Sequence, residues 1–591
     1  MHQHHQLSAH GAVAAVLACG LAGPALLGAQ SLRAADRTGP APAVEAAERA
    51  LRDARRAQAR FESARRRLVP EVDAAVGRCD QHIGRFCYWY DDVPAGPDEP
   101  RRVGQARAEL LHHLDVAAAT APETPWVLGQ RVRYRVEAGQ ADSALAALGT
   151  CAAGDWWCSA LRGFALHAAS RDVEAQGAFD AALTSMPAEQ RCRWQDITLL
   201  LDDHARREYA PLPCGAERER FERQYWWLAR PLWSRPGDDR RNEHFARVTL
   251  SHMLEDARTP HGLRWAADMH EMGVRYGWPV RWSRRATRQL SDPMTVVGHE
   301  AVPSYEFGPS LHALQHPDSA GPDDWRLSEP LARSRYAPAY VRRFAPLAAQ
   351  VAVFRRGDSL LVVAASALPD SSADDSLALA LAASADDSLR VAPRAAAGAP
   401  RVRALLAPAP AGAYVASVES TSDSASARRL RLAVRAPPVA GALGVSDLLL
   451  FAAEDSAGGE AMPPAPPASL EAVLPLALGD AVVSTPGEVG VYWEVYGLPP
   501  GRPRVRFSLS LTGDRPGWLA RVGERLRREP RRRPVLLQWE DVPMVNGNVT
   551  ARGVTVQLPR LPEGAYKLQL RVTSPDGGRV VAERGLRIVR R

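Results

Sequence analysis

The chain has 591 residues, enough for about three to five domains of ordinary size. Its 46% hydrophobic and 24% charged residues are typical of globular proteins and exclude a chain that is mainly disordered or fibrous. The formal net charge is +7, but the excess lies in residues 501–591, while residues 1–500 are slightly acidic. An anionic partner is therefore expected only for the last part of the chain.

The N-terminus has the pattern of an export signal. Residues 11–29 are small and apolar, and a polar segment follows them. Cleavage after Ala29 is favoured, with a lipoprotein processed at Cys19 as the alternative, because Val16-Leu17-Ala18-Cys19 resembles a lipobox. We therefore expect residues 1–29 to be a signal peptide and the protein to reach the periplasm or cell envelope.

Six cysteines follow the predicted signal peptide, and an even number in an exported chain indicates disulfides. A metal site at Cys79, His82 and Cys87 is the weaker alternative, because the chain has no Cys-x-x-Cys motif. Pairing between sequence neighbours is the simplest arrangement, although other pairings are open. The expected disulfides are Cys79–Cys87, Cys151–Cys158 and Cys192–Cys214.

The region before residue 216 predicts helices. Residues 44–68 predict one long amphipathic helix, and the acidic residues between its arginines indicate a solvated face. Residues 126–148 and 155–183 each predict two helices, split at Gly139 and near Ser170. These pairs resemble tetratricopeptide repeats, whose surfaces bind partners, and a generic helical bundle fits the pattern equally well.

Residues 216–290 hold six of the fifteen tryptophans and predict a further helix from Arg240 to Ala257. Such aromatic density is more typical of a core than of a ligand site. Two stretches stand out in this block, Asn242-Glu243-His244-Phe245-x-Arg247 and Trp265-x-x-Asp268 followed by Val274-x-Tyr276-Gly277-x-Pro279. Both resemble the GWxTD domain, which is known from exported bacterial proteins.

The resemblance is incomplete in this block and continues further along the chain. Arg264, Ala267 and Met269-His270 stand where the family pattern has Gly, Thr and Arg-Gly, so a site made of those residues would be missing here. The family's β-region is matched at residues 444–450, 491–498 and 561–568. The resemblance is therefore to a divergent member, and it implies an exported protein without an assigned activity.

The chain after residue 346 predicts antiparallel β-sandwiches, because short alternating strands are separated by Gly and Pro turns. A hairpin is expected around Gly357, and a break near Pro437 indicates two sandwiches. Residues 517–533 predict a basic amphipathic helix that either lies on an anionic membrane surface or covers one end of the second sandwich. The arginines that would meet such a membrane are Arg521, Arg525, Arg528, Arg531, Arg532 and Arg533.

A search for chemistry finds no established catalytic or phosphate-binding motif, and we expect no catalytic, cofactor-binding or metal-binding residues. His244 and His252 lie two helical turns apart, too far to share one metal ion. Asp268 and Glu271 either form a carboxylate pair or belong to a helix surface. The densest group of candidates is Glu243, His244, His252, His261 and His270.

The predicted fold class is multidomain, with N-terminal all-α helical repeats, a Trp-rich α/β GWxTD-like block and C-terminal antiparallel β-sandwich domains. The predicted function is an exported, non-enzymatic interaction or scaffolding protein with an envelope protein partner and no nucleic acid. The alternatives are an envelope hydrolase or carbohydrate-active protein, with a site near Trp226, His244 and Asp268, and a membrane-surface anchor. The expected segments are the signal peptide 1–29, an N-terminal helical region 30–118, tetratricopeptide-like repeats 119–215, the Trp-rich block 216–300, a linker 301–345, a first sandwich 346–437 and a second sandwich 438–591 with the insertion 517–533.

Overall fold

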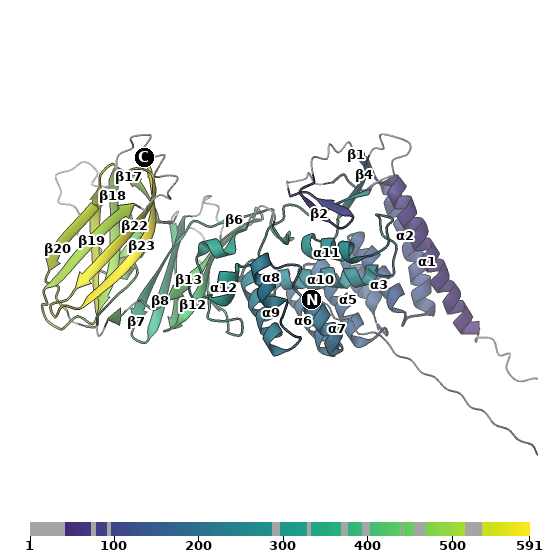
Figure 1. The fold of residues 1–591 in the computed structure, drawn as a ribbon, viewed down its shortest axis with the longest axis horizontal. Helices are drawn as coiled ribbons and strands as arrows, with labels where there is room; N and C mark the ends of the chain where they lie inside the picture. The colour runs from purple at the N-terminus through teal and green to yellow at the C-terminus, as the bar shows by residue number, and fades with distance from the viewer. Residues whose placement is uncertain are drawn as a thin grey trace, which may run out of the picture.

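Helices form the first part of the molecule and sheets form the second, as Figure 1 shows in this computed structural model. The predicted order of an α region followed by a β region is therefore confirmed. The structure describes residues 42–72, 79–90, 96–149, 151–285, 296–327, 332–367, 376–392, 402–437, 439–440, 443–453, 467–513, 535–545 and 547–590.

The predicted long helix is α1, Pro42–Leu68, and it packs against α2, Arg101–Thr120. Small residues such as Ala54 and Ala57 allow this close approach, with Phe61 filling the space beside them. The expectation of a solvated arginine face holds only for part of α1. Arg65 is 1% exposed and forms ion pairs, so its charge is compensated inside the protein rather than by water.

Two antiparallel helix pairs follow α2. The first pair is α3, Pro125–Glu137, and α4, Ala141–Leu148; the second is α5, Asp155–Ala168, and α6, Asp172–Ser185. The turns lie where the sequence predicts them, at Gly139 with φ 71° and at Ser170 with φ 58°. Glycine adopts this left-handed conformation without steric cost, which explains its place at the first turn.

Helix α10, Asp239–Leu254, is the central helix of the α region, because α3, α5, α6, α9 and α11 all pack against it. Its inward face carries Phe245 and Leu254, and these join the main hydrophobic core. The other helices here are α7, Ala188–Gln195; α8, Asp203–Tyr209; α9, Ala216–Ala229; and α11, Ala267–Tyr276.

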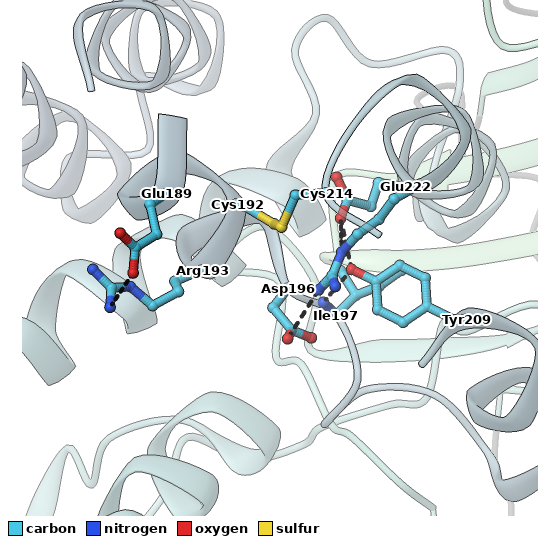
Figure 2. Close-up of a disulfide and its surroundings, with 9 residues drawn as sticks. Glu189, Cys192, Arg193, Asp196, Ile197, Tyr209, Cys214 and Glu222 are labelled. Atoms are coloured by element: carbon cyan, nitrogen blue, oxygen red, sulfur yellow. Dashed lines mark hydrogen bonds and ion pairs between the residues drawn. A yellow bond between two sulfur atoms is a disulfide. The ribbon is translucent and has the colours of Figure 1, made fainter. Parts of the chain in front are cut away.

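The three expected disulfides are present: Cys79–Cys87, Cys151–Cys158 and Cys192–Cys214. Figure 2 shows the last of them, which joins α7 to the segment just before α9. Beside it, the buried Tyr209 hydroxyl donates to Glu222 over 2.6 Å. Disulfides persist in oxidising compartments, so these bonds indicate an extracytoplasmic environment.

Short strands complete the α region. The hairpin of β2, Gln81–Ile83, and β3, Phe86–Tyr88, is the element that Cys79–Cys87 closes. A second small sheet has the order β1-β4-β5 and includes a parallel pair between residues far apart in sequence. Its strands are β1, Glu71–Val72; β4, Arg281–Arg285; and β5, Val296–His299.

The segment 301–345, which the sequence predicts as a linker, packs into the protein. Phe307 and Tyr336 join Phe344 and Leu232 in one buried cluster, so this segment connects the two regions through a core of its own. It contains α12, Leu311–Gln315, the 3-10 turn Pro322–Trp325 and the start of β6, Arg343–Pro346.

The first β-sandwich has a five-stranded sheet, in the order β10-β9-β12-β13-β6, and a three-stranded sheet, in the order β11-β8-β7. The predicted hairpin joins β7 to β8 with Gly357 at φ 63°. The strands are β7, Gln350–Arg356; β8, Ser359–Ala367; β9, Ser376–Ala382; β10, Arg390–Val391; β11, Val402–Pro410; β12, Ala413–Ser422; and β13, Ser426–Arg435.

The second β-sandwich consists of two sheets that face each other. One sheet is built around β18, and the other has the order β17-β23-β22-β19-β20. Strand β18 pairs with β15, β16 and β21 along its length. The strands are β14, Val439–Ala440; β15, Leu443–Val445; β16, Leu449–Phe451; β17, Val482–Thr485; β18, Gly487–Tyr496; β19, Val505–Gly513; β20, Val535–Asp541; β21, Val549–Leu558; β22, Gly564–Thr573; and β23, Arg579–Arg590, with the short helix α13, Leu470–Val473, and the 3-10 turn Leu474–Leu476 before β17.

The helices and the four large sheets form one stack of layers, seen from right to left in Figure 1. Ala380 and Val415 of the five-stranded sheet share the helical core, and Phe354 of the three-stranded sheet packs against Tyr492 of the second sandwich. Inner strands are therefore buried on both faces, as in β9, whose sequence is SLALALA. Strand β22, in the sheet farthest from the helices, alternates buried and exposed residues, because one face of this sheet meets solvent.

Several sequence predictions lie outside the described residues. They are the signal peptide 1–29 with Cys19 and Ala29, and the basic insertion 517–533 with its arginines. Of the helices that the structure does describe, none has both the length and the apolar character needed to cross a bilayer.

Candidate functional site

A cavity of about 600 Å³ lies between the helix pairs, α10 and the Tyr276–Trp282 segment. Its walls come from segments far apart in the sequence, so the fold as a whole creates it. The described residues that line it are Arg65, Glu99, Arg107, Arg133, Val136, Glu137, Gly139, Phe164, His167, Ala168, Ser170, Asp172, Arg235, Glu243, Ala246, Arg247, Leu250, Tyr276, Gly277, Trp278, Pro279, Val280, Trp282, Ala301, Ser304, Tyr336, Ala337, Ala339 and Tyr340.

A line of charged side chains, Asp172, His167, Glu243 and Arg247, lies on the wall of this cavity. The Nε2 atom of His167 lies 2.7 Å from Glu243 Oε2, and Arg247 Nε donates to the other oxygen of Glu243 over 2.6 Å. The second ring nitrogen of His167, Nδ1, lies 3.7 Å from Asp172 Oδ1. A histidine between two carboxylates is a charged, ion-paired group rather than a neutral base.

The pKa values of this line follow from its contacts. Burial alone would lower the pKa of His167, but the Asp172 and Glu243 carboxylates outweigh burial and raise it to about 9. Burial raises the pKa of Glu243, but Arg247 and His167 outweigh that effect and hold it well below the usual range. Both groups therefore remain ionised at neutral pH.

Arg247 joins the two stretches that carry the GWxTD resemblance. Its Nη1 donates to the carbonyls of Val274 and Arg275 over 3.0 Å each, just before Gly277. Gly277 has φ 95°, and a side chain there would start 3.1 Å from Arg247 Nη2. Glycine is therefore required at this point for both its backbone conformation and its space. The sequence singled out these residues without showing that they meet at a cavity.

His244, the histidine of the Asn242–Arg247 stretch, has a packing role. It is fully buried, and its ring lies 5.0 Å from that of Trp226. Burial, followed by the charge of Arg240, lowers the pKa of His244 to about 3. His244 and Trp226 are therefore brought together as part of the core.

Asp268, the third residue of the hypothetical enzyme site, pairs with the β2–β3 turn instead. Its carboxylate accepts from Arg85 Nε over 2.6 Å and from Arg85 Nη2 over 2.7 Å. The side-chain bond from Arg85 is the main reason that the pKa of Asp268 falls to about 2. The structure thus gives Asp268 a role in fixing the hairpin to α11.

Replacing this carboxylate should have a small effect. Because Arg85 is 39% exposed, Asp268→Asn should lower the free energy of unfolding by only about 0.5–1 kcal/mol at neutral pH. Urea unfolding of this variant beside Asp53→Asn, at an exposed pair on α1, checks the value. A loss above about 3 kcal/mol would show that Asp268 carries more than the hairpin contact.

The remaining sequence candidates are separate from one another. Glu271 accepts from Arg275 over 2.8 Å, and His252 lies 3.0 Å from Glu255, the residue that follows α10. His261 packs edge-on against Phe86, and His270 lies 2.7 Å from Ser251 Oγ. Among the described residues, no three His, Cys, Asp or Glu side chains gather in a way that would hold a metal ion.

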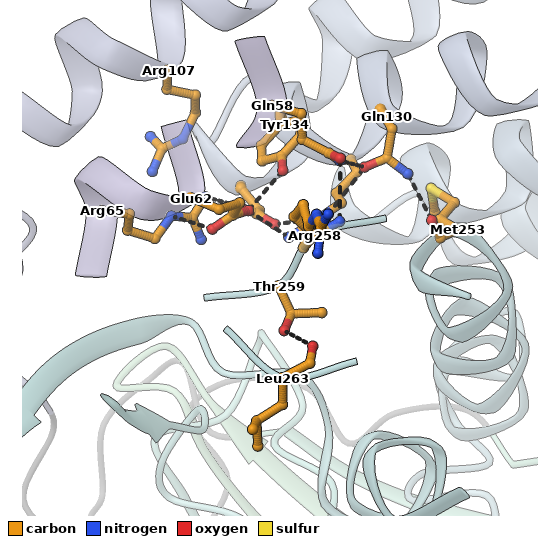
Figure 3. Close-up of polar contacts among 12 residues, drawn as sticks. Gln58, Glu62, Arg65, Arg107, Gln130, Tyr134, Met253, Arg258, Thr259 and Leu263 are labelled. Carbon is orange, nitrogen blue, oxygen red and sulfur yellow. Dashed lines mark hydrogen bonds and ion pairs between the residues drawn. The ribbon is translucent and has the colours of Figure 1, made fainter. Parts of the chain in front are cut away.

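One end of the cavity is held by a buried polar network, shown in Figure 3. Tyr134 Oη donates to Glu62 over 2.6 Å, and Arg133 Nη2 donates to the same oxygen over 3.1 Å. Arg65 and Arg133 both pair with Glu137. These contacts tie α1 to α3 and compensate charges that are almost fully buried.

The same network reaches α10. Gln58 donates to Gln130 over 2.7 Å, and Gln130 donates in turn to the carbonyl of Met253 over 2.6 Å. Figure 3 shows this row of side chains between the helices. These bonds connect α1 and α3 to α10 behind this end of the cavity.

A second hollow of about 820 Å³ lies beside α8 and α12 and is rich in carboxylates. Several of these have local structural roles. Asp202 caps α8 by accepting from two backbone N–H groups, and Asp324 accepts from Ser310 and Gly321. The charged cavity at His167 is therefore the stronger candidate.

Sequence reasoning missed most of the residues that form this site. His167, Tyr336 and Tyr340 belong to no motif, and Arg235 lies in a turn between α9 and α10. One weak signal was present, since His167 interrupts the apolar face of a predicted helix. Trp278 and Trp282 also line the cavity, although the tryptophans of their block were expected to form a core.

No protein-family model matches this chain, and no curated protein sequence matches it either. Among solved structures, dimeric latent PorU from Porphyromonas gingivalis is similar over 45% of this chain and 22% of its own, with 12% identity and a TM-score of 0.17. Red sea bream transglutaminase is similar over 57% and 47%, with 11% identity and a TM-score of 0.13. A calcium-binding mutant of β-glucuronidase 2 from Bacteroides uniformis is similar over 39% and 26%, with 9% identity and a TM-score of 0.15. The matched part is less than two thirds of each of these proteins, and likenesses this low bear on neither fold nor function.

Proposed function

We propose that this protein is an exported, non-enzymatic binding or scaffolding protein of the cell envelope, with the cavity at His167 as its recognition site. The observation that carries the proposal is the fixed charge of the His167–Glu243–Arg247 line. A general acid or base works best with a pKa near the operating pH. Here the pKa of His167 is about 9 and that of Glu243 is held low, so these groups present charge and do not exchange protons readily.

The family assignment is part of the proposal. The chain is a divergent GWxTD-domain protein, supported by the way Glu243 and Arg247 meet the Tyr276–Pro279 stretch at the cavity. The helix pairs α3–α4 and α5–α6 are tetratricopeptide-like repeats, and the cavity opens between them and α10. Such repeats present concave surfaces to partners, which fits an envelope protein as the partner.

The cellular location is also part of the proposal. A signal peptide at residues 1–29, with cleavage after Ala29 or lipidation at Cys19, would bring the chain to the periplasm or envelope. The three disulfides support export. An additional contact of residues 517–533 with an anionic membrane remains a separate proposal.

The carbohydrate-active or hydrolytic alternative is favoured by one observation. Burial raises the pKa of Glu300, next to the lining residue Ala301, to about 7, which suits a general acid. Trp278 and Trp282 would supply the aromatic surface for a sugar. This alternative requires turnover of a bound glycan that Glu300→Gln abolishes while binding persists.

Blocking the cavity should remove the partner. Ala168 is an exposed residue at the end of α5 that lines the cavity, so Ala168→Trp places an indole in the cavity without disturbing the core. In an affinity pull-down from the native cell envelope, we expect this variant to capture at least about 10-fold less of the partner than the unmodified protein does.

The matched control is Ala181→Trp, which adds the same indole at an exposed site on α6 outside the cavity. It should capture the partner as the unmodified protein does. Equal capture by both variants would mean that the partner binds elsewhere. Equal loss by both would show that the effect is not specific to the cavity.

A further inference from the structure

The cavity wall carries an excess of positive charge. Its described lining residues include five arginines and His167, against the four carboxylates of Glu99, Glu137, Asp172 and Glu243. All but one of these cations have a carboxylate partner. The pairs are Arg65–Glu137, Arg133–Glu137, Arg107–Glu99, His167–Glu243 and Arg247–Glu243.

Arg235 is the exception. Its guanidinium lies over the ring of Tyr340, 3.8 Å from the ring centroid, and no carboxylate of the described chain lies within ion-pair distance of it. The Tyr340 hydroxyl donates to Asp239 over 3.1 Å, which fixes the ring. The cation is thus held against an aromatic face at the cavity while its N–H groups have no protein carboxylate to bind.

Several nitrogen atoms of other lining residues also lack a hydrogen-bond partner among the described residues. Arg107 Nε and Trp278 Nε1 are buried, and neither has a hydrogen-bond partner in the part of the chain that the structure describes. Both are donors, and Arg107 is only 6% exposed. Both nitrogen atoms are closed off from solvent, so an anion in the cavity would be met by the Arg235 guanidinium rather than by these donors.

The cavity wall also has apolar side chains. Phe164, Leu250 and Pro279 line it together with Trp278. A volume of about 600 Å³ is in the range of small-molecule sites, which are mostly apolar with a few placed polar groups. A cation without a carboxylate partner, on a wall that also has apolar side chains, fits one class of molecule, an amphiphile with an anionic end.

We propose that the cavity binds an amphipathic anion, with its carboxylate or phosphate on Arg235 and its apolar body against Trp278, Pro279 and Leu250. The inference rests on the proposed function and names the class of ligand for the same site. A free long-chain acid and the headgroup end of a membrane lipid share this chemistry. Arg235 is a binding residue here, because its guanidinium touches the anionic group directly.

The test uses the complete exported protein and the dye anilinonaphthalene sulfonate, itself an amphipathic anion whose fluorescence reports binding in an apolar site. We expect the dye to bind, and dodecanoate or dodecyl phosphate to displace it at least about 10-fold better than dodecanol, a neutral chain of equal length. Displacement by dodecanoate identifies a free acid as the source, and displacement by phosphatidylglycerol vesicles identifies a lipid.

Variants assign the effect to the site. Arg235→Gln should lower the affinity for dodecanoate and dodecyl phosphate at least about 10-fold, with little effect on the affinity for dodecanol. Arg235→Lys should restore part of the lost affinity. Arg162→Gln removes one positive charge from an exposed site on α5 and should change nothing. Equal displacement by dodecanol, unchanged affinity in Arg235→Gln, or unchanged dye binding in Ala168→Trp would overturn the proposal.

The readouts separate this inference from the proposed function. Suppose that partner capture depends on Ala168 but dye binding does not depend on Arg235. That result contradicts the proposal of an anionic ligand and is consistent with the proposed recognition site. The reverse result supports the anion site and overturns the role of the cavity in capturing an envelope protein.

Discussion

Replacing Glu419 by Ala is expected to lower the free energy of unfolding by about 3–5 kcal/mol. Glu419 lies on β12, in the sheet that faces the helices, and is 1% exposed. Its carboxylate accepts from the backbone N–H groups of Trp233 over 2.7 Å and Ser234 over 2.8 Å. It therefore joins the first sandwich to the segment that follows α9.

The loss is large because the partners of Glu419 would stay buried. Arg431 has a fully buried side chain 3.8 Å from this carboxylate, and it also donates to the carbonyl of Leu228 over 2.6 Å. Removing Glu419 leaves the Arg431 cation without its nearby carboxylate and two backbone donors without their acceptor, inside the interface between the α and β regions.

Urea unfolding followed by circular dichroism measures the effect. Glu419→Gln keeps one acceptor and should lose less than Glu419→Ala, whereas Glu488→Ala, at an exposed position on β18, should change stability by no more than about 0.5 kcal/mol. A loss below about 1 kcal/mol in Glu419→Ala would mean that the interface does not depend on this carboxylate.

The second large effect is a fall in stability at alkaline pH that depends on His167. The pKa of His167 is about 9 in the folded protein against an ordinary value of 6.5, so folding strengthens its hold on the proton. Its contribution is therefore complete below about pH 6.5 and is lost as the pH rises through about 9. The size is on the order of 3 kcal/mol, at about 1.4 kcal/mol for each pKa unit.

Unfolding free energies at about pH 6 and about pH 9.5 give the measurement. Other buried groups titrate in this range, including Glu222 with a pKa of about 7. For that reason the quantity to compare is the difference between the unmodified protein and His167→Gln. We expect this difference to shrink by about 3 kcal/mol at the higher pH. A difference that is the same at both pH values would contradict an ion-paired His167.

Local patterns in the sequence predicted the local structure well. The cysteine spacing led to the correct disulfides, and Gly139 and Gly357 marked turns that the structure shows at positive φ. Such features depend on a few neighbouring residues and on backbone sterics. Periodicity likewise located α1 and the helix pairs, because one apolar stripe suffices to define an amphipathic helix.

Ion pairs between residues on different elements could not be predicted from local patterns. Arg65 has the sequence signature of a solvated arginine, yet it is buried because Glu62 and Glu137 lie beside it. Glu137 is on another helix, and no local pattern reveals that meeting. The segment 301–345 carried Pro and Gly residues typical of a linker, while Phe307 and Tyr336 bury against partners on both sides.

The candidate site was predictable only in fragments. The stretches around Glu243 and Gly277 stood out through a resemblance, but their meeting through Arg247 is a property of the fold. Arg235 had no signal at all, because an arginine in a polar turn is ordinary. Its significance comes from Tyr340, more than a hundred residues away, and from the cavity between them.

Photocrosslinking in the native cell envelope tests the central claim, that this cavity is a recognition site, most directly. Benzoylphenylalanine would replace Ala168 at the cavity or Ala181 on the outer surface of α6, both of them exposed helical positions. Irradiation should yield a specific covalent adduct at position 168 and none at position 181. No adduct at position 168, or equal adducts at both positions, would contradict the proposed recognition site.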